Sequence, residues 1–178
     1  MCIFISLLVC CVATAAAGND NDKPLRVAVA GVAHGHLNDV LSRMDRGDFE
    51  VVGVYEKDDR MRQDNGFTRR GDKVPFFADL DEMLDKTHPE AVVAYGPIYD
   101  HLEVVEACAP RGIHVMVEKP LAVNMKHAKR MAKLARQYGI LLLTNYETSW
   151  YSSNHEAYRM VKDGQIGDMT RILVYDGH

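Results

Sequence analysis

Two charged residues, Glu118 and Lys119, stand directly before Pro120 at the end of the apolar run IHVMV. A carboxylate and an ammonium at the mouth of a buried strand are costly to desolvate unless they pair with something, so their position favours a functional site. The alternative is structural, because proline cannot continue a strand ladder and charged residues are common where a strand reaches the surface. The choice depends on the rest of the chain.

A second set of candidate residues lies in the stretch VAVAGVAHGHLNDVL, after the first apolar run. Gly31 allows the tight turn of a G-x-G-x-x-G dinucleotide loop, but Ala33 and His36 occupy its second and third glycine positions. Glu56 ends the next apolar run, 25 residues after Gly31, within the spacing of an acid that binds the adenosine ribose. A carboxylate there repels a 2′-phosphate, which predicts NAD rather than NADP, although the neighbouring Lys57 could soften that preference.

Short strands and helices must position these residues. The runs LRVAVAG, FEVVGVY, EAVVAYG, IHVMVE and ILLLTN are nearly continuous and rich in Val, Ile and Leu, as is typical of parallel strands covered on both faces. Between them, Gly47 ends one helix, Asp79 caps another, and Asn124 and Gly139 bound a third. The alternation predicts an α/β fold, a Rossmann-type doubly wound parallel sheet. An apolar stripe on the third helix is expected to pack in the core: Met125, Ala128, Met131, Ala132, Ala135 and Tyr138.

Composition narrows the class of partner. The 178 residues, 47% of them hydrophobic, can form one sizeable core and the beginning of a second. A net charge of -4 without a long basic run argues against nucleic acid, so a small molecule is the expected partner. No metal site is predicted. Cys108 lies in an apolar helical pattern and is expected to be a buried, unreactive thiol.

The N-terminal stretch MCIFISLLVCCVATAAAGNDND has the layout of a secretory signal peptide. Cleavage after Ala15 or Ala17 is expected, so residues 1–17 are assigned to the signal and the mature protein is predicted to be exported, periplasmic or secreted. The run is shorter than the roughly 20 residues of a spanning helix, so no integral membrane segment is predicted in the mature chain. No Lys or Arg precedes the apolar run, so the alternative that this segment is not a working signal stays open. In that case the protein would be cytoplasmic. Lipidation at Cys10 or Cys11 is disfavoured, because Val9 and Cys10 are not small residues.

The stretches VAVAGVAHGH, YGPIYDHLEVVEACAPRGIHVMVEKPLAV, and VKDGQIGDM followed by LVYDGH resemble the Gfo/Idh/MocA family, the relatives of glucose-fructose oxidoreductase and inositol dehydrogenase. The resemblance covers nearly all of residues 25–178, and Glu118-Lys119-Pro120 is its most specific element. It implies an NAD-binding Rossmann domain over residues 25–147. Residues 148–178 would begin a second, α+β domain that covers the active site and often forms the dimer.

The resemblance also implies roles for individual residues. Lys119 would be catalytic, contacting the substrate hydroxyl beside the nicotinamide and handling its proton. Glu118 would position the cofactor and the lysine, Pro120 would follow a cis peptide bond, and Asn145 would reach the nicotinamide end. For His101, a helix-start histidine bonded to a carbonyl stays an alternative. His34 and His36 either pack in the phosphate loop or contact substrate. The implied cofactor-binding set is Gly31, Ala33, His34, Gly35, His36, Glu56, Tyr95, Gly96, Pro97, His101, Glu118, Lys119, Pro120 and Asn145.

The implied activity is that of an NAD(P)-dependent oxidoreductase which transfers hydride to or from a sugar, polyol or related carbohydrate. Two alternatives stay open: an exported NAD-dependent glycoside hydrolase that forms a transient keto-sugar, and a non-catalytic dinucleotide-binding fragment. The full-length form is expected to be a homo-oligomer. Because residues 148–178 supply only the start of a second domain, the 178-residue chain alone is expected to be inactive. The segment NYETSWYSS lacks an Arg often found in the family, which leaves the substrate open.

Overall fold

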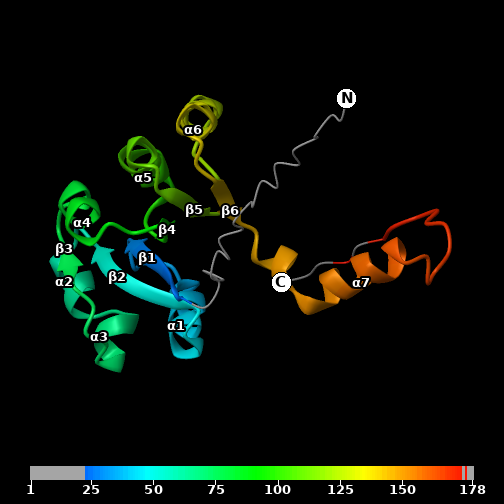
Figure 1. Cartoon of the computed structure of the whole chain (residues 1–178), viewed down its shortest axis with the longest axis horizontal. Helices are drawn as coiled ribbons and strands as arrows, with labels where there is room; N and C mark the ends of the chain where they lie inside the picture. The colour runs from blue at the N-terminus through cyan, green and yellow to red at the C-terminus, as the bar shows by residue number, and fades with distance from the viewer. Residues whose placement is uncertain (1–22, 174, 176–178) are drawn as a thin grey trace, which may run out of the picture.

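A single parallel sheet forms the centre of the computed structural model, which describes residues 23–173 and residue 175 (Figure 1). The predicted signal segment, residues 1–17, lies outside the described residues. The strand order is β3-β2-β1-β4-β5-β6, and every neighbouring pair is parallel. This order confirms the predicted Rossmann-type α/β fold. The strands are β1 (Leu25–Ala30), β2 (Phe49–Tyr55), β3 (Phe76–Phe77), β4 (Ala91–Ala94), β5 (His114–Glu118) and β6 (Leu142–Asn145).

The strand order reverses between β1 and β4, which are hydrogen-bonded neighbours although β2 and β3 separate them in the chain. Both faces of β1 are covered, and Val27, Ala28 and Val29 are at most 1% exposed. Continuous burial explains why this strand is an unbroken apolar run rather than an alternating one. In open sheets of this kind, a ligand crevice forms outside the carboxyl ends of the strands, where the order reverses.

The helices begin and end where the sequence predicted. The side chain of Asp79 accepts the N–H of Glu82, and that of Asn124 accepts the N–H of His127. Gly47 and Gly139 end their helices in the left-handed conformation, at φ +77° and +68°. The helices are α1 (Leu37–Arg46), α2 (Asp59–Gln63), α3 (Gly66–Arg70), α4 (Leu80–Thr87), α5 (His101–Cys108), α6 (Met125–Tyr138) and α7 (Ser152–Lys162), with short 3₁₀ turns η2 (Ile98–Asp100), η3 (Ala109–Arg111) and η4 (Glu147–Trp150).

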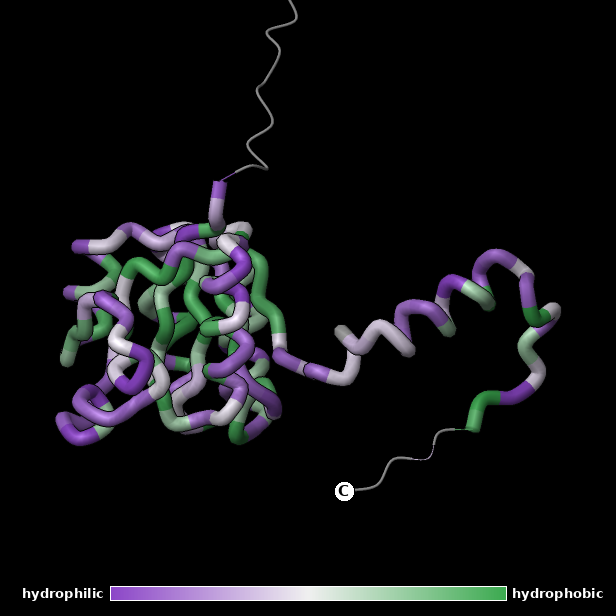
Figure 2. The backbone as a smooth tube through the Cα atoms, turned by 90° about the horizontal axis from the view of Figure 1, so that it is seen from below, coloured by the Kyte–Doolittle hydropathy of each residue, from purple (hydrophilic) through white to green (hydrophobic). Residues whose placement is uncertain are grey.

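Hydrophobic side chains pack in a cluster on each face of the sheet. On one face α4, α5 and α6 pack against the strands, and on the other face α1 and α3 do so. Figure 2 shows the strands as the most hydrophobic part of the tube. Cys108 is fully buried in the first cluster, and burial raises the pKa of its thiol to about 12, in agreement with the predicted inert thiol.

The predicted apolar stripe of α6 was wrong at its two ends. Met125 is 69% exposed and Tyr138 is 41% exposed. The fully buried residues of α6 are Met131 and Leu134, in the middle of the helix. Met131, Leu134 and the partly buried Ala135 are the residues of α6 that pack into the cluster, so its first and last turns lie outside it.

Helix α7 lies apart from the sheet and follows β6 through the turn η4 (Figures 1 and 2). None of its residues is buried. The described residues after it, 163–173 and 175, contain no strand. Among the described residues, no helix is both long and apolar enough to cross a membrane.

Candidate active site

The turn after β1 packs directly against the turn after β4. Gly31 has φ +85°, and a Cβ there would lie 2.5 Å from the Cα of Gly96. Hydrogen bonds fix this contact: the N–H groups of Tyr95 and Gly96 both donate to the carbonyl of Ala30, at 2.8 and 3.1 Å. Because the left-handed φ and the close approach both exclude a side chain, position 31 requires glycine.

The loop that follows Gly31 leads into the N-terminus of α1. Ala33 and Gly35 are exposed, and a Cβ added to Gly35 would meet nothing within 4 Å. The N-terminus of a helix carries partial positive charge, which suits a phosphate, and in α1 the first N–H groups donate to the carbonyls of the loop itself. The side chain at the second glycine position, Ala33, therefore leaves this part of the loop open to an anion, whereas His36, at the third position, is half-buried against Glu118.

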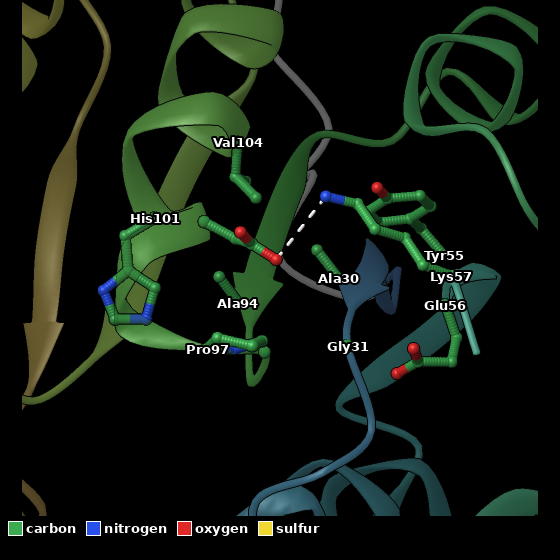
Figure 3. A pocket seen from close by; sticks show the side chains of 11 residues that line it. Ala30, Gly31, Tyr55, Glu56, Lys57, Ala94, Pro97, His101 and Val104 are labelled. Atoms are coloured by element: carbon green, nitrogen blue, oxygen red, sulfur yellow. Dashed lines mark ion pairs between the residues drawn. The ribbon is translucent and has the colours of Figure 1, made fainter. Parts of the chain in front are cut away.

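Glu56 lies at the end of β2, beside this loop. Its side chain is held at both oxygens: Oε2 accepts the N–H of Val32 at 3.1 Å, and Oε1 accepts the N–H of Asp58 at 3.0 Å. A cavity of about 40 Å³ opens next to it (Figure 3). The structure brings five of the predicted cofactor-binding residues to the wall of this cavity: Gly31, Glu56, Gly96, Pro97 and His101.

Lys57 is already paired at the mouth of the cavity. Its ammonium contacts Glu103 at 2.9 Å and Asp100 at 3.5 Å, and Figure 3 marks the second contact with a dashed line. The hydrogen bond to Glu103 raises the pKa of Lys57. Asp100 and Glu103 thus neutralise this lysine, and with Glu56 also lining the cavity the resulting negative excess disfavours a 2′-phosphate.

Glu118 forms the centre of a second group of side chains, at the carboxyl ends of β5 and β6. It is 2% exposed, and its Oε1 accepts the Asn145 amide at 2.6 Å and contacts His36 Nδ1 at 2.8 Å. Its Oε2 accepts the N–H of Lys119 at 3.2 Å. The β5–β6 register pairs Glu118 directly with Asn145, which explains why the two side chains meet. Burial opposes the ionisation of Glu118, but the hydrogen bonds from Asn145 and His36 outweigh it and lower its pKa.

His36 joins three segments that are far apart in the sequence. Its Nδ1 faces Glu118, and its Nε2 contacts Glu147 Oε2 in η4 at 2.6 Å. Its backbone N–H donates to His34 Nδ1 at 3.2 Å, and the two imidazole rings are 4.4 Å apart. The hydrogen bond to Glu118 raises the pKa of His36. Glu147 was missed by the sequence analysis, because no local motif indicates that a residue of the segment after β6 returns to the first loop.

Lys119 and Pro120 are exposed at the edge of this group, and the peptide bond between them is cis, as predicted. His101 lies beneath them and is 1% exposed. Its Nδ1 contacts the carbonyl of Leu121 at 3.2 Å, whereas its buried Nε2 has no hydrogen-bond partner among the described residues. The structure therefore shows the carbonyl-bonded histidine that was one of the two alternatives, although the ring also lines the cavity of Figure 3.

Tyr95 lies elsewhere. Its side chain is 1% exposed and packs with Val27, Val29 and Val40 in the cluster beneath α1. It does not line the cavity beside Glu56 but borders a groove on the α1 side of the sheet. Its contribution to the predicted site is the backbone N–H that fixes the Gly31–Gly96 crossing.

Comparisons with known proteins agree with this geometry. Residues 25–146 match the profile of the Gfo/Idh/MocA oxidoreductase family, whose members have an NAD-binding Rossmann fold. The chain is 28% identical over 150 residues to D-glucoside 3-dehydrogenase of Escherichia coli, covering 83% of this chain and 42% of that protein. It is 32% identical over 87 residues to dTDP-3,4-didehydro-2,6-dideoxy-alpha-D-glucose 3-reductase of Streptomyces antibioticus, covering 49% and 26%.

Solved structures share the fold. The WlbA dehydrogenase of Bordetella pertussis, in complex with NADH and UDP-GlcNAcA, superposes with a TM-score of 0.70 at 22% identity, covering 83% of this chain and 42% of that one. Myo-inositol 2-dehydrogenase of Lactobacillus plantarum superposes with a TM-score of 0.65 at 22% identity, covering 82% and 43%. The chain spans less than half the length of each of these relatives. Its sequence and its sheet identify it as a member of the Gfo/Idh/MocA family of NAD-binding oxidoreductases.

Proposed function

We propose that this chain is the cofactor-binding part of an enzyme that transfers hydride between NAD and a carbon bearing a secondary hydroxyl in a sugar or inositol ring. The observation that carries the proposal is that Glu118, Lys119 and Asn145 meet at the carboxyl ends of β5 and β6. There His36, from the loop after Gly31, contacts Glu118. A dinucleotide fits these residues, because the open loop suits its pyrophosphate and the carboxylate of Glu56 suits its adenosine ribose. NAD is proposed rather than NADP, because Lys57 is neutralised by carboxylates.

Lys119 is the proposed proton-handling residue. When bound, the nicotinamide supplies the hydride acceptor or donor. During oxidation of an alcohol, the lysine amine takes the hydroxyl proton while the C–H hydride leaves and the carbonyl forms; in the reverse direction its ammonium returns that proton. Glu118 orients the lysine by accepting its backbone N–H, and Asn145 holds the carboxylate in place.

The names of the relatives support the substrate class. They include a D-glucoside 3-dehydrogenase, a sugar-nucleotide 3-reductase and a myo-inositol 2-dehydrogenase. Each name describes oxidation or reduction at a ring position. The glycoside hydrolase alternative also begins with such an oxidation, so the product distinguishes the two activities.

Binding and turnover test the proposal separately. Calorimetric titration of the chain should show that NAD binds more tightly than NADP. With a second, substrate-covering domain present, a panel of glucosides and inositols should yield NADH and a keto product. Release of a free sugar without net NADH would instead favour the hydrolase. Binding without turnover on any substrate would favour the non-catalytic fragment, and equal or absent binding of the two cofactors would contradict the proposed site.

A further inference from the structure

The group of side chains around Glu118 has a second chemical property. His34, His36 and Glu118 each offer one ligand atom of the kind that holds a metal ion, and these three atoms lie within 4.8 Å of one another. The two histidines are half-buried and the carboxylate is buried. They come from two segments, the loop after β1 and the end of β5, which the sheet order brings together.

Hydrogen bonds orient these groups as they are oriented in metal sites. A histidine that binds a metal through one ring nitrogen usually donates the other N–H to a carboxylate, which fixes its tautomer. His36 shows this arrangement, because Nδ1 faces Glu118 at 2.8 Å while Nε2 contacts Glu147 at 2.6 Å. The Glu118 carboxylate is itself held by Asn145, as ligating carboxylates generally are.

The charge of the group also favours a cation. The ion pairs that the structure shows for Glu118 and Glu147 both involve His36, so two carboxylates share one imidazole. Two carboxylates beside one imidazole leave an excess of negative charge next to the buried Glu118, and this excess favours a cation. A divalent ion would compensate both.

We propose that His34, His36 and Glu118 bind a divalent transition metal ion of the zinc type, although the sequence predicted no metal site. Two imidazoles and one carboxylate are typical ligands of zinc sites that keep a fourth position open. His36 binds through Nδ1 and Glu118 through Oε1, so the ion replaces the hydrogen atom between them.

Binding requires a local rearrangement. Metal–ligand distances of about 2.0–2.2 Å place two ligand atoms roughly 3–4 Å apart, so the most distant pair must approach by about 1 Å. His36 Nδ1 and Glu118 Oε1, which are 2.8 Å apart, must separate slightly. His34 can make this movement, because it lies in an open loop next to Gly35, where even an added Cβ would meet nothing within 4 Å. Its Nδ1 would exchange the N–H of His36 for the ion.

Titration of the 178-residue chain with Zn²⁺ and Co²⁺ tests the site without any substrate or cofactor. The protein is first stripped of metal with a chelator, and its accessible thiols are alkylated so that they cannot bind the ions. Calorimetry should give one ion per chain, and Co²⁺ should produce the visible absorption of a four- or five-coordinate complex. Failure of NAD binding would not affect this result, so the two proposals fail independently.

Variants distinguish this site from binding elsewhere. His34→Ala and His36→Ala should each weaken Zn²⁺ by at least about 10-fold, and Glu147→Gln should also weaken it, because a lost outer carboxylate typically costs about 10–100-fold. His155→Ala, in exposed α7, is the matched control and should bind as the parent does. Circular dichroism verifies the fold of each variant. His34 and Glu147 are not fully buried, so the His34→Ala and Glu147→Gln variants remain informative if His36→Ala unfolds. The proposal is overturned if the parent binds no ion, or if the folded His34→Ala and Glu147→Gln variants bind as tightly as the parent.

Discussion

Replacing Gly31 with alanine should destabilise the whole domain. The residue has φ +85°, where an L-residue costs about 1–2 kcal/mol. The new Cβ would also lie 2.5 Å from the Cα of Gly96, and relieving such an overlap with backbone typically costs about 1–3 kcal/mol. Together these terms predict a loss of roughly 2–5 kcal/mol, against a total of about 5–15 kcal/mol for a domain.

Urea denaturation followed by far-ultraviolet circular dichroism measures this loss as a lower unfolding midpoint. Gly35→Ala is the matched control in the same loop, because its Cβ would meet nothing within 4 Å. That variant should unfold within about 0.5 kcal/mol of the parent, as exposed substitutions usually do. It should nevertheless bind NAD more weakly if the pyrophosphate approaches this loop. Equal midpoints for Gly31→Ala and the parent would refute the crossing of the two turns.

Four further predictions concern the choice of cofactor, the turnover, the pH dependence of folding stability and the N-terminus of the mature protein. Glu56→Ala should narrow the difference in binding free energy between NAD and NADP by about 1–2 kcal/mol, the scale of a charged hydrogen bond. If calorimetry shows an unchanged difference, Glu56 does not contact the ribose. In a protein that also has the substrate-covering domain, Lys119→Ala should leave NAD affinity largely intact and lower turnover about 100-fold or more, and Lys119→Arg should not restore turnover. Normal turnover in the alanine variant would make this lysine structural. Burial lowers the pKa of His101, despite the opposing effects of the Leu121 carbonyl and of Glu118. As the pH drops below about 6.5 the unfolded chain therefore binds the extra proton first, and the stability should fall. His101→Asn, which can still donate to Leu121, should lose that part of the pH dependence of urea unfolding; an unchanged pH profile would show that His101 does not cause it. If residues 1–17 are a signal, mass spectrometry of protein from its native host should find a start near Gly18, whereas an intact Met1 would argue against export.

The sequence predicted those features that depend on neighbours along the chain. Five of the six strands followed from continuous apolar runs, the ends of α4 and α6 from Asp79, Asn124 and Gly139, and the fold class from their alternation. The two-residue strand β3 was not predicted, because it is too short to give an apolar run. Glu56 was placed beside the Gly31 loop by the spacing of one strand-helix-strand unit. Each of these features is decided by local geometry or by a single crossover connection.

Features that depend on contacts between distant segments were not predictable from the same patterns. The pairing of His36 with Glu147 requires both the sheet order and the path of η4 after β6. The burial of Tyr95 depends on which side of β4 faces α1, and an apolar strand covered on both faces gives no alternation from which to read this. The exposure of Met125 depends on which turns of α6 pack against the cluster.

A crystal structure of the chain with bound NAD is the measurement that tests the proposed function most directly. The account predicts that the adenosine ribose hydroxyls contact Glu56, that the pyrophosphate lies at the N-terminus of α1, and that the nicotinamide lies within reach of Lys119 and Asn145. A dinucleotide bound elsewhere, or one whose nicotinamide points away from Lys119, would contradict it.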